Sequence, residues 1–305
     1  MGWKQMVARA TSRKGFGTLA MALAFAVAGV ATSLPAQAQI KDTKHNLGTT
    51  GTGVNKFSGT AEICVFCHTP HGADTSAAVP LWNRALPAAN TFTTYDSLGT
   101  SSLDGKVVPV GSVSVACLSC HDGVTSMSTV INQPGSGGYV VGGSAMAGTW
   151  SGANQSNGTL GVANQISNIG QDLKNDHPVG IQYGGGGITI TTPAAATKDA
   201  DFIKPANKVL NNTTVWWVDT EVTANAERNK TDMLLYTRAA NGSTSSASDA
   251  EPFVECASCH DPHTKANPTF LRISNDGSAV CLACHVKYRD TRAGREVGTP
   301  LAQEE

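Results

Sequence analysis

The pentapeptide Cys-x-x-Cys-His occurs four times in this chain of 305 residues and uses all eight of its cysteines. This pattern is the attachment signature of haem c: two thiols bond to the porphyrin, and the histidine that follows is the proximal ligand of the iron. A chain attached to four macrocycles at fixed points has few ways to fold. We expect four covalent haem c groups, attached through Cys64, Cys67, Cys117, Cys120, Cys256, Cys259, Cys281 and Cys284, with His68, His121, His260 and His285 as proximal ligands.

Paired cysteines also occur in zinc sites and in disulfide frameworks. A structural zinc ion takes four ligands in all, and a disulfide takes two cysteines and nothing else. Neither a zinc site nor a disulfide framework requires a histidine directly after every second cysteine. Haem attachment explains that histidine and is therefore the favoured interpretation.

The four motifs belong to two copies of a longer pattern. Residues 64–71 read CVFCHTPH and residues 256–263 read CASCHDPH, and each segment is followed by a motif of the form CLxCH. An upstream histidine also matches, in HNLG at residues 45–48 and in HPVG at residues 177–180. A pattern that occurs twice in the same order predicts a duplicated dihaem unit.

The duplication predicts a simple domain organisation. We expect a signal peptide at residues 1–38, a first dihaem unit at 39–130, an insertion at 131–250 and a second dihaem unit at 251–305. The insertion is rich in Gly, Ser and Asn and contains His177 and candidate short strands.

The composition favours a core built around cofactors. Aromatic residues make up only 6% of the chain and 32 residues are glycine, so side chains alone would form a weak hydrophobic core. We expect a multihaem cytochrome c fold with a haem-centred core, mostly coil, with short helices at the CxxCH turns and a few short β-strands. Residues 187–192 and 213–218 have the β-branched and aromatic character of two such strands, which could form one hairpin, and residues 243–248 predict a linker.

Four histidines remain once the proximal ligands are counted, and four irons need four distal ligands. These histidines stand at matching places in the two copies, so we expect bis-histidine ligation of every iron. The alternatives are ordinary surface or core histidines, or at least one iron that is open or bound by methionine, although the methionines follow no repeated pattern. The candidate distal ligands are His45, His71, His177 and His263.

The spacing of the CxxCHxPH segments restricts which iron each distal histidine can reach. His71 follows His68 by three residues, which span only about 10 Å when extended. A link this short cannot pass round a macrocycle, so His71 and His68 should serve different irons, as should His263 and His260. Two haems linked in this way must lie close together, which favours rapid electron transfer. Keeping ligands within each copy, we assign His45 to the first iron and His71 to the second. In the second copy we assign His177 to the third iron and His263 to the fourth.

The first 38 residues have the pattern of a secretory signal peptide. Lys4, Arg9, Arg13 and Lys14 precede an apolar run that ends in Ala-Gln-Ala, a small-x-small cleavage site. A retained membrane anchor is the alternative. Cleavage would remove four of the 22 basic residues and none of the 23 acidic ones, which leaves 18 against 23 and a net charge of −5. We expect an exported bacterial protein, periplasmic or extracellular, with no membrane span after signal removal and no nucleic-acid partner.

The motif CxxCHTPHG, with HNLG before it and HPVG later in the chain, resembles the multihaem cytochromes of metal-reducing bacteria. In particular it is similar to the tetrahaem subunits that polymerise into extracellular cytochrome filaments, or nanowires. The resemblance covers the haem-binding segments and hardly the loops between them. It implies a continuous haem stack, bis-histidine irons and one axial histidine supplied by the adjacent subunit, for which His45 is the candidate.

These observations predict an electron-transfer protein and not an enzyme, because an iron with two imidazole ligands has no open position for substrate. The expected partners are other cytochromes or extracellular electron acceptors, and further copies of the chain in a homopolymer. Two alternatives stay open. One is a soluble periplasmic tetrahaem carrier, and the other is a multihaem oxidoreductase with one open haem site.

Overall fold

The computed structural model describes residues 39–101, 103–135, 138–176, 179–221, 227–239 and 248–286. All eight cysteines lie within these ranges. The described residues belong to one compact unit, Gln39–Glu305. The expected signal peptide, His177 and nearly all of the expected linker at 243–248 lie outside the described residues.

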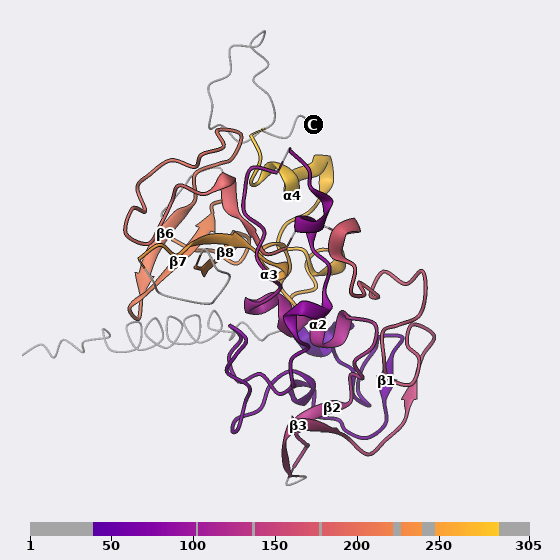
Figure 1. The fold of residues 1–305 in the computed structure, drawn as a ribbon. Helices are drawn as coiled ribbons and strands as arrows, with labels where there is room; N and C mark the ends of the chain where they lie inside the picture. Colours follow the sequence, from indigo (N-terminus) through magenta and orange to yellow (C-terminus); the bar gives the residue numbers. More distant parts are fainter. Residues whose placement is uncertain are drawn as a thin grey trace, which may run out of the picture. The chain divides into compact units, whose positions relative to one another are not determined.

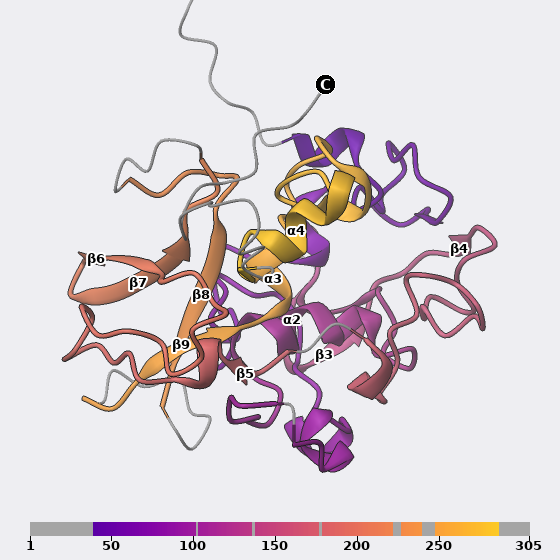
Figure 2. The same ribbon diagram turned by 90° about the horizontal axis from the view of Figure 1, so that it is seen from above.

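The α-helices of the described residues are short and coincide with three of the four attachment motifs. They are α2 at Ser112–His121, α3 at Cys256–Cys259 and α4 at Ala279–Leu282, and the first motif begins on the 3-10 turn η2 at Cys64–Phe66. Residues three apart lie on the same side of a helical turn, so each turn brings its two cysteines together. In both views α3 lies between α2 and α4 (Figures 1 and 2).

The start of α3 shows how the sequence specifies such a turn. Glu255 and Ser258 form a capping box, in which each side chain accepts a hydrogen bond from the other's backbone N–H. The Ser258 hydroxyl accepts from the Glu255 N–H at 2.9 Å. The two side chains thus bind backbone donors at the helix start, so this pair stabilises a helix of only four residues.

Further 3-10 turns connect these elements. They lie at Gln39–Asp42 (η1), Ala89–Thr91 (η3), Tyr95–Leu98 (η4), Leu173–Asn175 (η5), Tyr183–Gly185 (η6), Pro268–Phe270 (η7) and Asp276–Ser278 (η8).

The largest sheet has five antiparallel strands in the order β5-β9-β8-β7-β6 and is seen best in Figure 2. Its strands are Ile181–Gln182 (β5), Ala206–Leu210 (β6), Thr213–Val218 (β7), Met233–Arg238 (β8) and Glu251–Val254 (β9). β9 leads directly into the third motif, so the sheet positions the start of α3.

Two small antiparallel sheets lie on the other side of α2 in Figure 2. β1 at Lys56–Phe57 pairs with β4 at Trp150–Ser151, and β2 at Thr129–Asn132 pairs with β3 at Tyr139–Ala145.

The strand expected at residues 213–218 is present as β7, but the one expected at 187–192 is wrong. The partner of β7 in its hairpin is β6. Asn211 and Asn212 connect them with φ values of 48° and 62°, the conformation that a two-residue hairpin turn requires. The segment 187–192 instead begins at the last of four glycines at 184–187, all with positive φ, and this run interrupts the extended backbone after β5.

Three separate groups of buried apolar side chains form the core, and each packs against attachment cysteines. The first includes Phe57, Phe66 and Met127 and contacts Cys67 and Cys120. The second includes Trp82, Val115 and Leu118 and also contacts Cys67, and the third includes Tyr183, Trp216 and Leu235 and contacts Cys259 and Cys284. Apolar surfaces therefore lie beside the points where a macrocycle would be attached.

A single buried arginine joins α2 to the segment that leads into β2. Arg84 is 1% exposed, and its guanidinium donates to the backbone carbonyls of Ser119, Ser126, Met127 and Thr129 and to the Ser119 hydroxyl. A buried charge is tolerated when its donors are satisfied, and here five hydrogen bonds satisfy them.

We predict that Arg84→Met destabilises the haem-loaded protein by at least about 3 kcal/mol, because buried carbonyl oxygens lose their donor. Urea unfolding measures the effect. The matched control is Lys208→Met, which removes an exposed ion pair with Glu227 and should change stability by about 1 kcal/mol or less. Equal stabilities of the two variants would contradict the structural importance of Arg84.

Candidate functional site

Each of the four Cys-x-x-Cys-His motifs forms one turn that ends at its histidine. We name them motifs I to IV, at residues 64–68, 117–121, 256–260 and 281–285. In motifs I, III and IV the backbone N–H of the histidine donates to the carbonyl of the first cysteine, at 2.7, 3.2 and 2.9 Å. Motif II lies within the last turns of α2. Both thiols and the imidazole are thus presented from a single turn, as covalent haem attachment requires.

Three of the four expected proximal histidines have the same anchor at Nδ1. The ring Nδ1 of His68 lies 2.8 Å from the Pro80 carbonyl, that of His121 2.7 Å from Ser167, and that of His260 2.7 Å from Thr269. A carbonyl only accepts, so Nδ1 must be the donor and Nε2 keeps its lone pair for a metal. This is the arrangement of a metal-ligating histidine, and it fits haem iron.

None of the eight cysteines forms a disulfide, and Cys67, Cys259 and Cys284 lie next to the apolar groups of the core. Burial raises the pKa of Cys67 and Cys284 to about 12 and that of Cys259 to about 11. Thiols held in the neutral form are poor thiolate ligands and poor nucleophiles. Among the residues that the structure describes, no three His, Cys, Asp or Glu side chains converge to hold one metal ion, so the zinc alternative has no ligand cluster there.

The attachment points lie next to one another in the order of the sequence. Cys67 of motif I and Cys120 of motif II pack against the same apolar group. Cys117 of motif II lies beside Cys256 of motif III, whose backbone N–H donates to the Ser114 hydroxyl of α2 at 2.9 Å. Motifs III and IV share the third apolar group.

A buried polar network fixes motif II against motif III. The Arg238 guanidinium pairs with Glu255 at 2.9 Å, and both side chains are almost fully buried. The Ser114 hydroxyl of α2 donates to the other oxygen of Glu255 at 2.5 Å and accepts from the Cys256 N–H at 2.9 Å. The sheet, α2 and α3 therefore meet at one carboxylate.

Two pairs of histidines approach each other, and they are not the pairs expected from the repeat. The ring centres of His68 and His263 are 6.2 Å apart, and those of His45 and His121 are 6.3 Å apart. The within-copy assignment instead placed His263 at the fourth iron and His45 at the first. Each observed pair combines a proximal candidate with a distal one.

The remaining histidines show no such pairing. His71 is exposed, and its carbonyl accepts from the Asn132 side chain at 2.6 Å. His285 is exposed and packs against the Phe202 ring at 4.3 Å. Within the described ranges, the rings of His71, His260 and His285 have no ring contact with another histidine. His177 lies outside those ranges.

Burial keeps two of the paired histidines neutral. Burial lowers the pKa of His45 to about 4, and it also lowers the pKa of His121. A neutral imidazole is the form that binds iron, so both rings are ready ligands at neutral pH.

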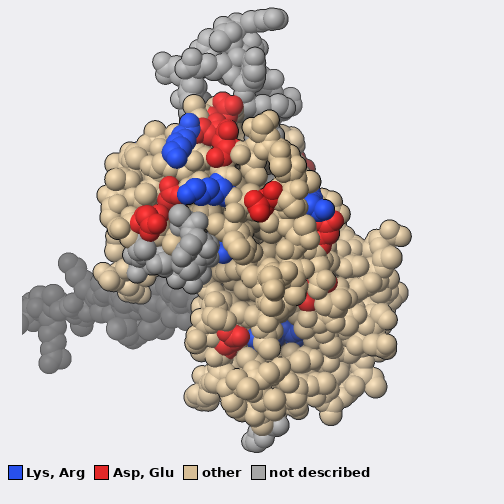
Figure 3. Space-filling view, in the orientation of Figure 1, with Lys and Arg blue, Asp and Glu red and all other residues tan. Residues whose placement is uncertain are grey.

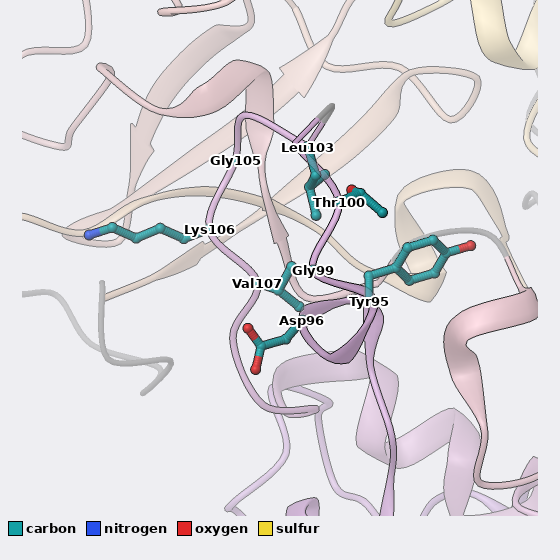
Figure 4. A pocket seen from close by; sticks show the side chains of 8 residues that line it. All are labelled: Tyr95, Asp96, Gly99, Thr100, Leu103, Gly105, Lys106 and Val107. Carbon is teal, nitrogen blue, oxygen red and sulfur yellow. The ribbon is translucent and has the colours of Figure 1, made fainter.

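A surface hollow of about 400 Å³ lies over residues 95–107, away from these groups. Neither cysteine nor histidine lines it, and Figure 4 shows Tyr95 and Lys106 pointing in opposite directions. Its polar side chains do not converge on a common point, so the hollow is no candidate for haem or for a catalytic site.

Comparison with known proteins supports the haem interpretation. Residues 251–290, which contain motifs III and IV, match the family model of the doubled CXXCH motif. No curated protein matches the chain. The match supports a multihaem c-type cytochrome, which is a haem-binding electron-transfer protein. No helix in the described part of the chain is long and apolar enough to cross a membrane.

The pH dependence of stability tests the junction at Glu255. Burial raises the pKa of this carboxyl from 4.5 to about 7, against the opposing charge of Arg238. The folded protein then holds a proton that the unfolded chain releases, so this stabilisation is complete below pH 4.5 and is lost as the pH rises to 7. We predict that Glu255→Gln removes this loss from a plot of Tm against pH. Parallel plots for the two proteins would contradict the prediction.

Proposed function

We propose that this chain is an exported tetrahaem c-type cytochrome that carries electrons along four closely packed haems with bis-histidine ligation, without substrate chemistry of its own. The observation that carries the proposal is the contact between neighbouring attachment points, above all the buried junction where Ser114 of α2 accepts from the Cys256 N–H and donates to Glu255. Four attachment points that follow one another through a single unit define a path and leave no haem isolated.

The residues of the chain supply position and environment for such a path. When bound, haem c supplies a one-electron couple between ferric and ferrous iron. The cysteines would hold each group at its edge, and His68, His121 and His260 would be oriented by carbonyls at Nδ1. The apolar groups beside Cys67 and Cys284 would exclude water and favour low reorganisation on electron transfer.

The number of attached haems is the first test. We predict that the intact mass of the exported protein corresponds to the chain without residues 1–38 plus four haems. Replacing both cysteines of motif IV by alanine should leave three haems, because the other motifs do not depend on it for attachment. Fewer than four haems in the unaltered protein would contradict the proposal.

An oxidoreductase would have an iron with an open coordination position for substrate, whereas a carrier would not. A carrier with bis-histidine irons should stay low-spin and should not bind carbon monoxide when reduced. Rapid carbon monoxide binding to the unaltered, assembled protein would favour the enzyme.

The proposal extends to an extracellular filament made of copies of this chain, with His71 as the ligand that crosses between subunits. The sequence assigned that part to His45, but His45 lies beside His121 of its own chain. His71 is exposed, whereas the equivalent histidine of the second copy, His263, lies beside His68. In the filament, His71 of one molecule would lie beside a proximal histidine of a second molecule, as His263 lies beside His68 within one molecule.

The surroundings of His71 support a contact with a second copy. The adjacent Gly72 lies against the ring of Tyr139 on β3. β3 pairs on one side only and exposes Tyr139, Val140 and Val141, the last of them 76% exposed. Few charged side chains lie over β1 to β3 in the view of Figure 3. An exposed ligand, a free strand edge and an apolar surface together fit an interface that covers all three.

The second surface of such a contact would carry an iron whose distal ligand comes from the neighbouring molecule. His260 and His285 are both exposed, and no described histidine is in contact with either ring. An exposed histidine at one contact and an exposed haem iron at the other would join copies head to tail, which generates an open polymer.

Electron microscopy of the exported protein tests this assembly. We predict filaments for the unaltered chain and single particles with four haems for His71→Ala and for Val141→Asp. Lys106→Ala, in the hollow of Figure 4, is the control and should leave filaments intact. Monodisperse particles of the unaltered protein would refute polymerisation and leave the electron-transfer proposal standing.

A further inference from the structure

The separation of the paired imidazoles matches ligation of one iron from both sides. Metal–imidazole bonds of about 2 Å, with roughly 1 Å from each nitrogen to its ring centre, put two axial ring centres about 6 Å apart. The ring centres of His68 and His263 are 6.2 Å apart, and those of His45 and His121 are 6.3 Å apart. Parallel rings in direct contact lie closer, as His45 and Phe270 do at 4.4 Å, whereas the nearly parallel rings of His68 and His263 are 6.2 Å apart.

The rings of the first pair are held so that one nitrogen of each stays available. The Nδ1 of His68 donates to the Pro80 carbonyl. The Nδ1 of His263 lies 3.3 Å from the Asp261 carboxylate. Anchoring at Nδ1 leaves Nε2 as the ligating atom in both rings, and the ring planes differ by only 19°.

In the second pair, His45 is held by residues of the second repeat unit. The His45 ring lies against the backbone of Pro262, the residue before His263. The His45 ring also stacks on Phe270, with an interplanar angle of 4°. Nearby, Lys265 forms an ion pair with Asp42 at 3.2 Å. The N-terminal segment and the segment that follows motif III therefore bind each other.

We infer that the second repeat unit completes the sites of the first two irons: His263 is the distal ligand of the iron bound by His68, and His45, held by the second unit, is the distal ligand of the iron bound by His121. This inference rests on the proposed haem attachment and adds to it the ligand set of two irons. Neither unit is then a complete dihaem module, because the iron of motif I takes its distal ligand from the second unit. The arrangement also brings motif III, three residues before His263, close to the haem of motif I.

Removing each distal ligand in the full haem-loaded chain tests the assignment. His263→Ala and His45→Ala should each give one additional high-spin ferric haem by electron paramagnetic resonance, while the mass still shows four haems. Added imidazole should restore the low-spin signal, which it would not do for a merely misfolded variant. Four attached haems with no additional high-spin iron in these variants would overturn the inference but not the proposed function, whereas loss of haems from the unaltered chain would overturn both.

Removing one haem at a time identifies the partner. In a chain whose motif I cysteines are both alanine, His263→Ala should add no high-spin iron. In a chain whose motif IV cysteines are both alanine, the same substitution should still add one. If His263→Ala instead adds a high-spin iron in the chain without motif I and none in the chain without motif IV, His263 belongs to the fourth iron, as the repeat alone suggests, and the pairing is refuted.

A conservative replacement covers the case in which an alanine variant does not fold. His263→Met keeps an iron ligand, and methionine in place of histidine raises the reduction potential of a haem. We expect one of the four potentials to rise in a redox titration, and this change should vanish when motif I is removed. A titration identical to that of the unaltered chain would contradict the assignment.

Discussion

The contact between α2 and α3 determines how the rest of the chain can be arranged. The Glu255 carboxylate accepts from Ser114 of α2 and from Arg238 of β8, and it caps the first turn of motif III. These groups are buried, so each would carry a large desolvation cost if the others moved away. The network fixes motif II beside motif III in the middle of the series. Arg84 does the same for α2 and the segment around β2.

This central contact joins the two expected repeat units, because Ser114 lies in the first and Glu255 in the second. β9 of the second unit pairs with β5 and β8, which belong to the expected insertion. Phe270, from the second unit, stacks on His45 of the first. A duplicated sequence thus folds into one interlocked structure, in which the link between units is made by the same histidines that are candidate iron ligands. Proposed electron transfer from one unit to the other would then need no separate docking step.

The sequence predicted local features well where the spacing of neighbouring residues determines them. The Cys-x-x-Cys-His spacing specifies a single helical turn, and all four motifs adopt one. The β-branched and aromatic run at Thr213–Val218 was sufficient to predict β7. Its hairpin partner was missed because two asparagines in left-handed conformation form the turn, and the strand expected at residues 187–192 is disrupted by the glycines before it.

Long-range features could not be predicted, for a physical reason. Local spacing excluded His263 as a ligand of its own motif's iron, but choosing among the other irons requires the packing of α2 against α3. Arg84 has no periodicity or motif around it, and only its five buried hydrogen bonds reveal its importance. Glu255 offered one signal, its position directly before a helical Cys-x-x-Cys, which is where a helix cap is expected.

An experimental structure of the exported, haem-loaded protein tests the central claim most directly, because it shows the ligands of every iron at once. We predict four haems that follow one another from motif I to motif IV, with His68 and His263 on opposite sides of the first iron. A first iron that is open, or that is ligated by any residue other than His263, would contradict it.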